Sequence, residues 1–484
     1  MHLRPVLLAI GIMTALLGAA MLPCALIDIA DGRAESHVFG VSAFGSIFIG
    51  VCLWVLCRSE NQQTGQREAF LLTVLVWIVL PAIAAIPFLA SGMTLTNASF
   101  ESISGLTTTG ATLLTGLDDM PRGLLLWRAI LQWIGGIGII VTAIAILPQL
   151  RVGGMQLFQL ESSDISGKFL PRVTEIATQM GLAYLLISIL CATSYYAVGM
   201  TPFDAVAHSM TTVSAGGFST HDASFGYFAD TNAAYVATVF MFIAGLPFSL
   251  LAILLFQGRI MPLLKDPQPR LYFGIVAIMA ATIVIYHDLY VSPPYFDSTY
   301  HGTRQALFNI ISVMTGTGYA STNYDSWGDP IRIIFLGATF LGGCAGSAAC
   351  GIKMFRIEIG FKAIIAYTKR MMQPHRLAPV RYAGRIVDAS TLQSVMVFVF
   401  LYLATFLVAA ALLGLTGLDA ITAISGAATS VSNVGPGLGS TIGPSGTFQT
   451  LPDAAKWICA IAMLLGRLEF VAVFVVLTPR FWRG

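Results

Sequence analysis

The chain has 484 residues, of which 56% are hydrophobic and 10% are charged, and its formal net charge is +2. So few charged side chains cannot cover the surface of a soluble domain, and apolar runs recur along the whole chain, which also excludes a soluble head on one anchor. No alternation at a spacing of about 10 residues, typical of a membrane barrel, is present. The composition predicts an all-α polytopic membrane protein.

Apolar runs of the roughly 20-residue length of a transmembrane helix recur along the chain. Typical runs are residues 5–27, 38–57, 69–90, 125–148, 232–256 and 388–414. The first run is longer than the apolar core of a cleavable secretory signal, which is about 7–15 residues. We therefore interpret it as a retained first helix.

The basic residues predict the orientation of the spans. We assume that the N-terminus is cytoplasmic, that successive helices cross the membrane in alternate directions, and that half-penetrating segments return to their own side. The cytoplasmic parts are then the termini and residues 58–68, 149–173, 257–270 and 353–388. These parts carry 19 of the 26 Lys and Arg, whereas 15 of the 24 Asp and Glu lie outside. This positive-inside bias predicts cytoplasmic termini and an acidic external mouth that concentrates cations.

Four external connections share one pattern, in which a short amphiphilic stretch precedes a Gly- and Thr-rich segment. The stretches are residues 96–112, 201–220, 301–322 and 418–439. Aligned on Gly110, Gly217, Gly318 and Gly435, each has Ser or Thr six and three positions earlier and an apolar residue four positions earlier. This register in four copies predicts an internal repeat.

Such a repeat suits the passage of a dehydrated monovalent cation. Backbone carbonyls can replace its hydration shell without fixed negative charge, so the ion binds and still leaves. Glycine tolerates the conformations that turn carbonyls toward one axis, and each short helix would aim its negative C-terminal end at the ion. The alternative is that the four loops are ordinary structural turns.

Arg467 lies near the centre of the last apolar segment, residues 457–479. A charge there costs at least about 2.5–3.5 kcal/mol. We predict that Arg467 lines the pore and acts as an electrostatic barrier beneath the filter. The alternative is a buried ion pair with a carboxylate elsewhere, although Glu469, two residues away, points to a different helix face.

Small residues at 342–351 interrupt the long apolar stretch 331–370 ahead of Lys353. Such residues weaken a helix and allow a break, which could form a movable gate in the pore. The alternative is close packing between helices. The seven cysteines form no CxxC pair and His208, His221 and His301 have no metal-site spacing, so neither disulfides nor a zinc site is predicted.

Five segments together resemble the Trk/Ktr/HKT superfamily of potassium transporters. They are TTTGAT at 107–112, GGFSTHD at 216–222, GGCAGS at 342–347, NVGPGLG at 433–439 and LLGRLE at 464–469. Their order and spacing are similar to those of the bacterial TrkH/TrkG-type membrane subunit, over essentially the whole chain.

The resemblance implies four potassium-channel-like helix–pore loop–helix repeats in pseudo-fourfold arrangement, after an N-terminal helix pair. The implied units are residues 1–66, 67–150, 151–262, 263–372 and 373–484. It also implies a homodimer in the bacterial inner membrane and a cytosolic TrkA-type subunit that alone binds nucleotide. Potassium is the implied transported ion, with no covalent cofactor, no enzymatic activity and no nucleic acid; membrane lipids are further partners.

The resemblance also implies roles for individual residues. The implied potassium filter is Thr108, Thr109, Gly110, Ala215, Gly216, Gly217, Thr317, Gly318, Asn433, Val434 and Gly435. The implied pore barrier is Arg467, and the implied gating loop contains Gly342, Gly343, Gly346, Ser347, Gly351 and Lys353. A glycine in all four filters implies a preference for potassium over sodium.

Two segments depart from the family pattern. The gating loop of close relatives continues Ser-Thr-Gly-Gly-Gly, whereas this chain has Ser347-Ala348-Ala349-Cys350-Gly351. The second unit has Gly245-Leu246-Pro247 where a more polar stretch is expected. Both departures leave the filter intact and concern the gate.

The sequence thus predicts channel-like potassium uptake, gated by a cytosolic partner. One rival is a proton- or sodium-coupled secondary transporter, which usually places carboxylates or histidines within spans. Here Glu469 is the only carboxylate deep in a span, while Glu101 and Asp204 lie near the loops. The other rival, a membrane-embedded enzyme, would need converging acid–base or nucleophilic groups, and the sequence offers none.

Overall fold

The computed structural model describes residues 3–33, 36–58, 65–145, 169–229, 231–291, 299–375, 377–468 and 470–483. These residues form helices and loops, together with one β-hairpin whose two strands have two residues each, β1 (Arg381–Tyr382) and β2 (Arg385–Ile386). The predicted all-α membrane fold is confirmed. Seven described helices are long and apolar enough to span a bilayer, or nine if two bent pairs each count as one span.

The chain begins with a helix pair and then repeats one unit four times. The pair is α1 (Leu3–Ala30) and α2 (Ser36–Cys57). The first unit contains α3 (Gln66–Ala84), α4 (Ile86–Ala90), the short helix α5 (Leu95–Leu106), η1 (Leu117–Asp119) and α6 (Arg122–Ala145). The second contains α9 (Phe169–Ala197), the short helix α10 (Pro202–Val213), η2 (Ser224–Phe228), α11 (Ala233–Ala244) and α12 (Phe248–Gln257), followed by α13 (Met261–Lys265).

The last two units follow the same order. The third contains α14 (Pro267–Tyr290), the short helix α15 (Thr299–Thr315), η3 (Tyr324–Trp327), α16 (Asp329–Leu341) and α17 (Met354–Met372). The fourth contains α18 (Ala389–Leu415), the short helix α19 (Ala420–Ser432), α20 (Gly439–Ile442), η4 (Phe448–Thr450), α21 (Asp453–Arg467), α22 (Val471–Leu477) and α23 (Pro479–Arg483).

Three of the short helices begin with the same cap, which extends the repeat beyond the register seen in the sequence. The side chains of Thr94, Thr201 and Asp419 accept hydrogen bonds from the backbone N–H three residues later. Each of these capping residues lies 16 positions before the aligned glycine of its unit. Side-chain oxygen satisfies N–H groups that a helix start leaves free, so these residues set where the short helices begin.

The run of spanning length predicted at residues 232–256 is a bent pair of helices and not one continuous helix. Helix α11 ends at Ala244 and α12 begins at Phe248, with an angle of 105° between them. Pro247 has no N–H to continue the α11 hydrogen-bond ladder, and its φ of −64° with ψ of 119° turns the chain into an extended conformation. The predicted break in 331–370 is present, between the end of α16 and the start of α17.

The expectation that Arg467 lies mid-helix is wrong. Arg467 is the last residue of α21, and α22 begins at Val471 at an angle of 106° to it. Glu469 lies outside the described residues.

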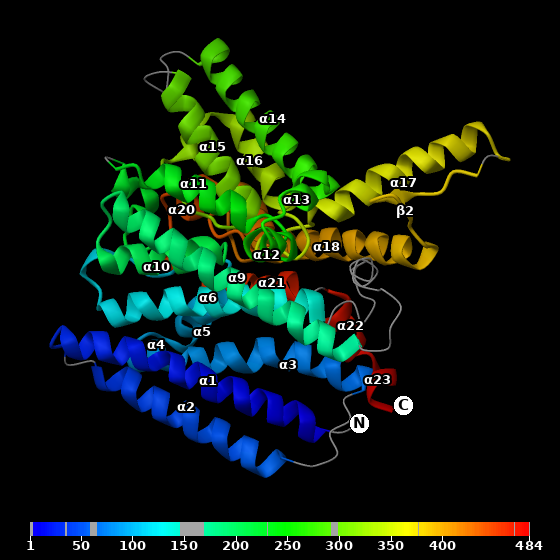
Figure 1. Ribbon diagram of the computed structural model, residues 1–484. Coiled ribbons are helices and arrows are strands. Elements are labelled where there is room, and N and C mark those ends of the chain that lie inside the picture. The colour runs from blue at the N-terminus through cyan, green and yellow to red at the C-terminus, as the bar shows by residue number, and fades with distance from the viewer. Residues whose placement is uncertain are drawn as a thin grey trace.

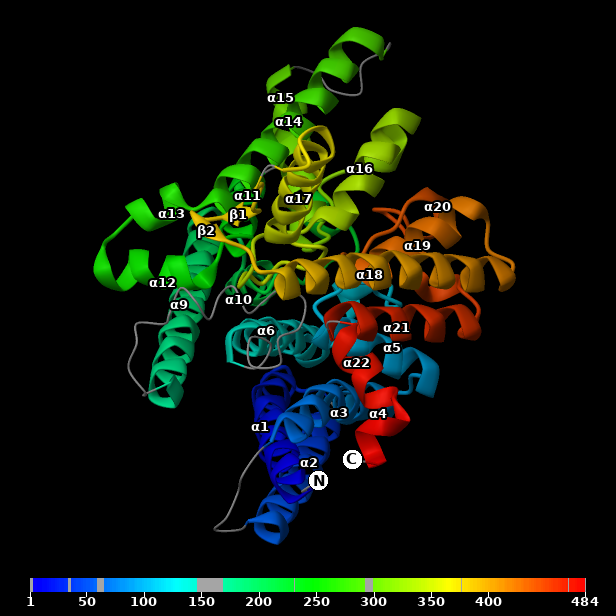
Figure 2. The same cartoon turned by 90° about the vertical axis from the view of Figure 1, so that its right-hand side faces the viewer.

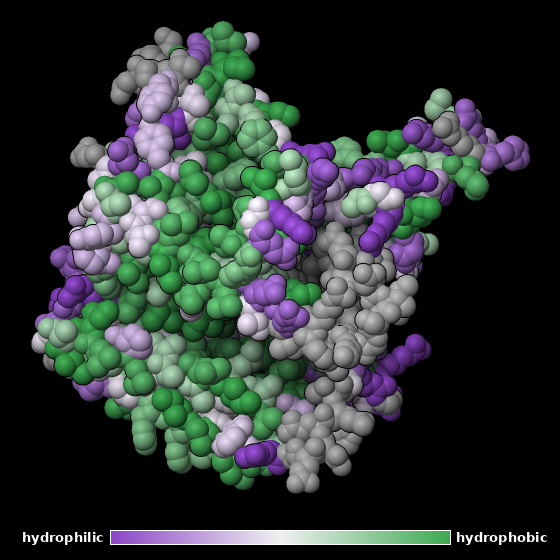
Figure 3. Space-filling view, viewed as in Figure 1, coloured by the Kyte–Doolittle hydropathy of each residue, from purple (hydrophilic) through white to green (hydrophobic). Residues whose placement is uncertain are grey.

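Helices α1, α2 and α3 run in roughly the same direction, α14 is steeply inclined to them, and α17 and the hairpin project from the body (Figure 1). Both chain ends lie on the side of the molecule toward which α17 projects. Viewed from that side, the units sit around a common centre, with the pair α1–α2 outside it (Figure 2). A broad apolar band crosses the face in Figure 3 from top to bottom, and hydrophilic residues gather on its left and right sides. This distribution fits a multi-pass membrane protein.

Candidate functional site: a four-loop ring

The four Gly-rich connections share one backbone conformation. Their aligned glycines, and the residues two positions earlier, all have left-handed φ values. The values are +81° for Gly110, +77° for Gly217, +77° for Gly318 and +105° for Gly435, and +53° for Thr108, +52° for Ala215, +81° for Gly316 and +54° for Asn433. Three of the earlier four carry side chains, for which this conformation is uncommon. The common geometry confirms that the repeat in the sequence has a structural cause.

The four connections also form a closed ring. A β-carbon placed on each aligned glycine would meet the carbonyl oxygen of the residue just before the next aligned glycine. The pairs are Gly110 with Gly216, Gly217 with Thr317, Gly318 with Val434, and Gly435 with Thr109. The contacts therefore run from unit one to two, three, four and back to one, which establishes the pseudo-fourfold arrangement.

The repeated hydroxyl groups brace the loops in two of the four units. Ser104 Oγ donates to the carbonyl of Ala111 at 2.6 Å, and Ser312 Oγ donates to that of Tyr319 at 2.7 Å. Thr107 and Thr315 bond equivalently to the last turn of their own helices. In the other two units the equivalent hydroxyls find other partners, except Thr429, whose buried Oγ1 has none among the described residues. The Ser and Thr hydroxyls at the same position of the four units therefore have only partly equivalent bonds.

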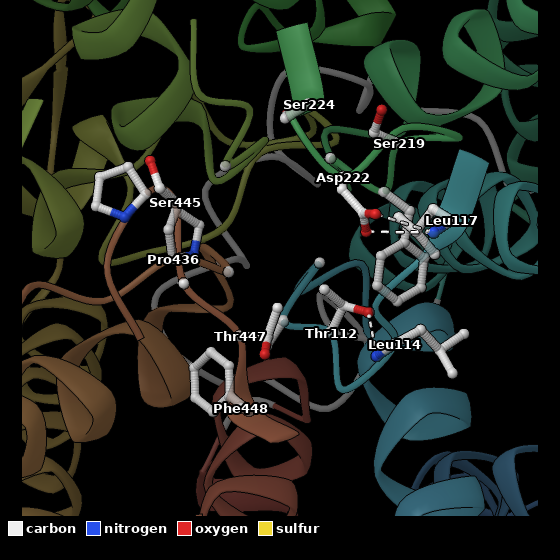
Figure 4. Close-up of a pocket in the computed structure, with 18 of the residues that line it drawn as sticks. Thr112, Leu114, Leu117, Ser219, Asp222, Ser224, Pro436, Ser445, Thr447 and Phe448 are labelled. Carbon is white, nitrogen blue, oxygen red and sulfur yellow. Dashed lines mark hydrogen bonds between the residues drawn. The ribbon is translucent and has the colours of Figure 1, made fainter. Parts of the chain in front are cut away.

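A cavity of about 210 Å³ opens outside the ring and is lined by residues from all four units, including the four aligned glycines. Figure 4 shows Thr112, Ser219, Asp222, Pro436 and Phe448 around its open centre. The Asp222 carboxylate points across to the first unit, where it accepts N–H bonds from Gly116 and Leu117 at 2.9 and 3.2 Å (Figure 4). The wall of the cavity thus ties units one and two together.

A buried ion pair supports the wall and was not predicted from the sequence. Arg128 Nε lies 2.8 Å from Glu101 Oε1, and the two side chains are only 1% and 0% exposed. Arg128 also donates to the Ser219 carbonyl at 2.9 Å and to Thr112 Oγ1 at 3.0 Å. Its guanidinium carbon lies 4.1 Å from the centroid of the Phe218 ring. One arginine of α6 therefore holds the segments that follow the first and second aligned glycines.

Gln132, one turn further along α6, braces the second connection directly. Its Nε2 donates to the carbonyl of Gly216 at 2.6 Å, and its Oε1 accepts the N–H of Phe218 at 3.0 Å. The amide thereby fixes the backbone on both sides of Gly217. A polar pair at i and i+4 on an otherwise apolar helix, Arg128 and Gln132, is the sequence signal that could have found this brace.

The histidines near the loops have more specific environments than the sequence indicates. His221 Nδ1 lies 2.5 Å from Asp118 Oδ1, Nε2 lies 3.5 Å from Asp204, and the ring stacks on Tyr227 at 3.5 Å. Partial burial disfavours the imidazolium, but the two carboxylates outweigh it and raise the pKa of His221. His208 is fully buried and bonds Ser219 Oγ at 3.0 Å.

The segment between α16 and α17 crosses beneath the ring. Cys350 N–H donates to the carbonyl of Thr315 at 3.3 Å, and its Sγ lies 3.8 Å from Thr108 Oγ1. Gly342, Gly346 and Gly351 have φ of +78°, +70° and +78°, and Lys353 has +73° at the start of α17. These left-handed residues let the segment fold back on itself, because glycine adopts such conformations at little cost.

The two departures from the family pattern lie against each other. The N–H of Cys344 donates to the carbonyl of Gly245 at 2.9 Å, and the N–H of Ala348 to that of Ala244 at 3.2 Å. In return, the N–H of Phe248 donates to Gly346 at 3.0 Å. The break at Gly245-Leu246-Pro247 exposes the backbone groups that hold the crossing segment, so the two sequence changes form one structural feature.

Arg467 lies at the same level and is only 4% exposed. Its Nη1 donates to Cys350 Sγ at 2.6 Å, while Nε and Nη2 have no hydrogen-bond partner among the described residues. The alternative of a buried pair with a carboxylate is not what the described residues show.

A profile of the TrkH family, described as "Cation transport protein", matches residues 36–483. The chain belongs to the TrkH family. It is 39% identical over 482 residues to the Trk system potassium uptake protein TrkI of Halomonas elongata, covering 99% of this chain and 97% of that protein. It is 35% identical to TrkH of Escherichia coli K12 over the full length of both, and 33% identical to TrkG of the same strain, covering 100% of this chain and 99% of TrkG.

The fold agrees with this TrkH-family membership. The crystal structure of the potassium transporter TrkH from Vibrio parahaemolyticus superposes with a TM-score of 0.90 at 34% identity, covering 100% of both chains. The resemblance seen in five short motifs therefore extends to the whole sequence and the whole fold.

Proposed function

We propose that the chain takes up potassium through a channel-like pore, with the four-loop ring as its selectivity filter. The closed cyclic contact of four equivalent connections supports this most directly, because ion selectivity by backbone carbonyls requires several carbonyls around one axis. The names of the relatives, Trk system potassium uptake proteins, support potassium as the ion.

In this proposal the filter oxygens come from the backbone at and just before each aligned glycine. The set comprises Thr108, Thr109 and Gly110, Ala215, Gly216 and Gly217, Thr317 and Gly318, and Asn433, Val434 and Gly435. Their carbonyls would replace the hydration shell of potassium, and the C-terminal ends of α5, α10, α15 and α19 would add negative potential. The Arg128–Glu101 pair and Gln132 would hold the ring at the diameter that this exchange requires.

Beneath the ring, Arg467 and the crossing segment would restrict passage. A guanidinium is always charged, so Arg467 below the filter would place a positive charge on the path of a cation. The residues Gly342, Gly343, Gly346, Ser347, Gly351 and Lys353 would allow the segment to move aside. Such movement would be driven by a cytosolic nucleotide-binding partner of the TrkA type.

Further parts of the proposal concern location and assembly. The units would be residues 1–66, 67–150, 151–262, 263–372 and 373–484, in a homodimer of the bacterial inner membrane. The positive-inside bias and the two chain ends on one side support cytoplasmic termini. Lys362, Lys369 and Arg381 line a cavity between α17 and the hairpin on that side, where they could meet anionic lipid headgroups.

Rubidium flux into proteoliposomes tests the proposal against a coupled secondary transporter. With a rubidium gradient alone, and with proton and sodium gradients collapsed, a channel-like pore continues to carry rubidium. Flux that stops when either gradient is removed would support the coupled mechanism instead.

A further inference from the structure

Cys350 stands where three of the four units meet beneath the ring. Its backbone N–H reaches the end of α15 in unit three, its Sγ approaches Thr108 of unit one, and Arg467 of unit four donates to the same sulfur. The residue is 6% exposed. A single side chain of the crossing segment therefore links the filter to the buried arginine.

Arg467 needs such a partner. A buried guanidinium offers five N–H donors, and each donor left unpaired away from water is costly. Among the described residues, Cys350 Sγ is its hydrogen-bond partner, and both Nε and Nη2 are unsatisfied. A glycine at this position would have no side chain to accept the bond.

Resting on the proposed function, we propose that Cys350 is a positioning residue that holds Arg467 beneath the filter and thereby couples the crossing segment to the barrier. When the segment leaves the ring, Cys350 leaves with it, and Arg467 loses the bond that keeps it on the axis. The two barriers then move together. Without the thiol, the segment and the arginine would move independently.

Rubidium flux through the full-length protein tests this coupling with Cys350→Ala, Cys350→Ser, Arg467→Ala and the double variant Cys350→Ala/Arg467→Ala. We expect Cys350→Ala to raise basal flux by at least roughly tenfold, the lower end of what a hydrogen bond to a charged group is worth. The serine variant, which keeps a shorter acceptor, should fall between Cys350→Ala and wild type. In the Arg467→Ala background, removing the thiol should add nothing further.

Cys191→Ala is the matched control, because Cys191 is equally a buried free thiol but lies on α9. Its flux should equal that of wild type. Site-resolved labelling with a membrane-impermeant maleimide adds a readout that does not depend on flux, since Cys350 should react faster in Arg467→Ala than in wild type.

The inference is overturned if Cys350→Ala carries wild-type or lower flux, or if it raises flux by the same factor with and without Arg467. A wild-type protein that carries no rubidium at all contradicts the proposed function instead. Unchanged labelling of Cys350 in Arg467→Ala would also contradict the bond between them.

Discussion

Replacing Arg128 with methionine tests the support of the filter wall. Methionine has a similar length but no donor, so Arg128→Met removes the ion pair with Glu101 and the bonds to Ser219 and Thr112 together. Because Glu101 is 0% exposed, its carboxylate is left buried without a counter-charge. Breaking a buried pair in this way costs roughly 3–5 kcal/mol.

The variant should therefore melt at a lower temperature and discriminate less between potassium and sodium, since the segments after Gly110 and Gly217 lose their common anchor. Glu101→Gln in the same chain removes the stranded charge, so the double variant should regain part of the lost stability. Arg128→Lys keeps the charge but loses the planar guanidinium with its several N–H donors, so its midpoint should lie between those of wild type and Arg128→Met.

Thermal midpoints in detergent at one scan rate, with rubidium and sodium flux on the same preparations, measure both effects. A melting temperature and a selectivity both equal to wild type would refute the role of Arg128. The role would also be refuted if the midpoint of the double variant Arg128→Met/Glu101→Gln falls by the sum of the two single changes, because the stability changes of residues that do not interact are additive.

Three further predictions follow the same logic. Asp118 and Asp204 raise the pKa of His221, so the charge on His221 stabilises the folded protein. This stabilisation is fully present below the ordinary pKa of about 6.5 and is lost as pH rises through the raised value. The thermal midpoint should therefore fall over that range in wild type but not in His221→Gln. Arg467→Ala should raise basal rubidium flux, and unchanged flux would contradict its role as a barrier. A β-carbon on Gly245 would lie 2.7 Å from the hydroxyl oxygen of Tyr272, which is buried and has no partner among the described residues, and 2.9 Å from the ring carbon that carries this oxygen. Gly245→Ala should therefore lower the midpoint, and adding Tyr272→Phe should restore only part of it; an unchanged midpoint in Gly245→Ala would contradict the clash.

Much of the fold could be predicted because its cause is local and repeated. The hydroxyl and glycine columns predict four equivalent loops, and the capping residues Thr94, Thr201 and Asp419 could have fixed the helix starts in advance. The helix break at Pro247 was equally local, yet the apolar run around it favoured a straight span. Periodicity of hydrophobic residues alone does not distinguish a straight helix from a bent one.

The rest depends on contacts between distant residues, which no local pattern specifies. Arg128 meets Glu101 across 27 positions, and Arg467 meets Cys350 across 117. Thr108 and Ala215 adopt a left-handed conformation at the ends of α5 and α10, where the next N–H bonds back to Ser104 and Thr211. Glycine usually takes this position, so the residue types there did not signal it. The order of the units around the ring likewise follows only from the contact between each aligned glycine and a carbonyl oxygen of the next unit.

Gly110→Ser tests the central claim, that the ring is a potassium filter. At φ of +81° the added β-carbon would collide with the carbonyl oxygen of Gly216, so the ring must open at that contact. Gly116→Ser is the matched control, because Gly116 has φ of +74° in the same loop with open space around it. The account predicts that rubidium-over-sodium selectivity in proteoliposomes falls in Gly110→Ser and stays at the wild-type value in Gly116→Ser; wild-type selectivity in Gly110→Ser would contradict it.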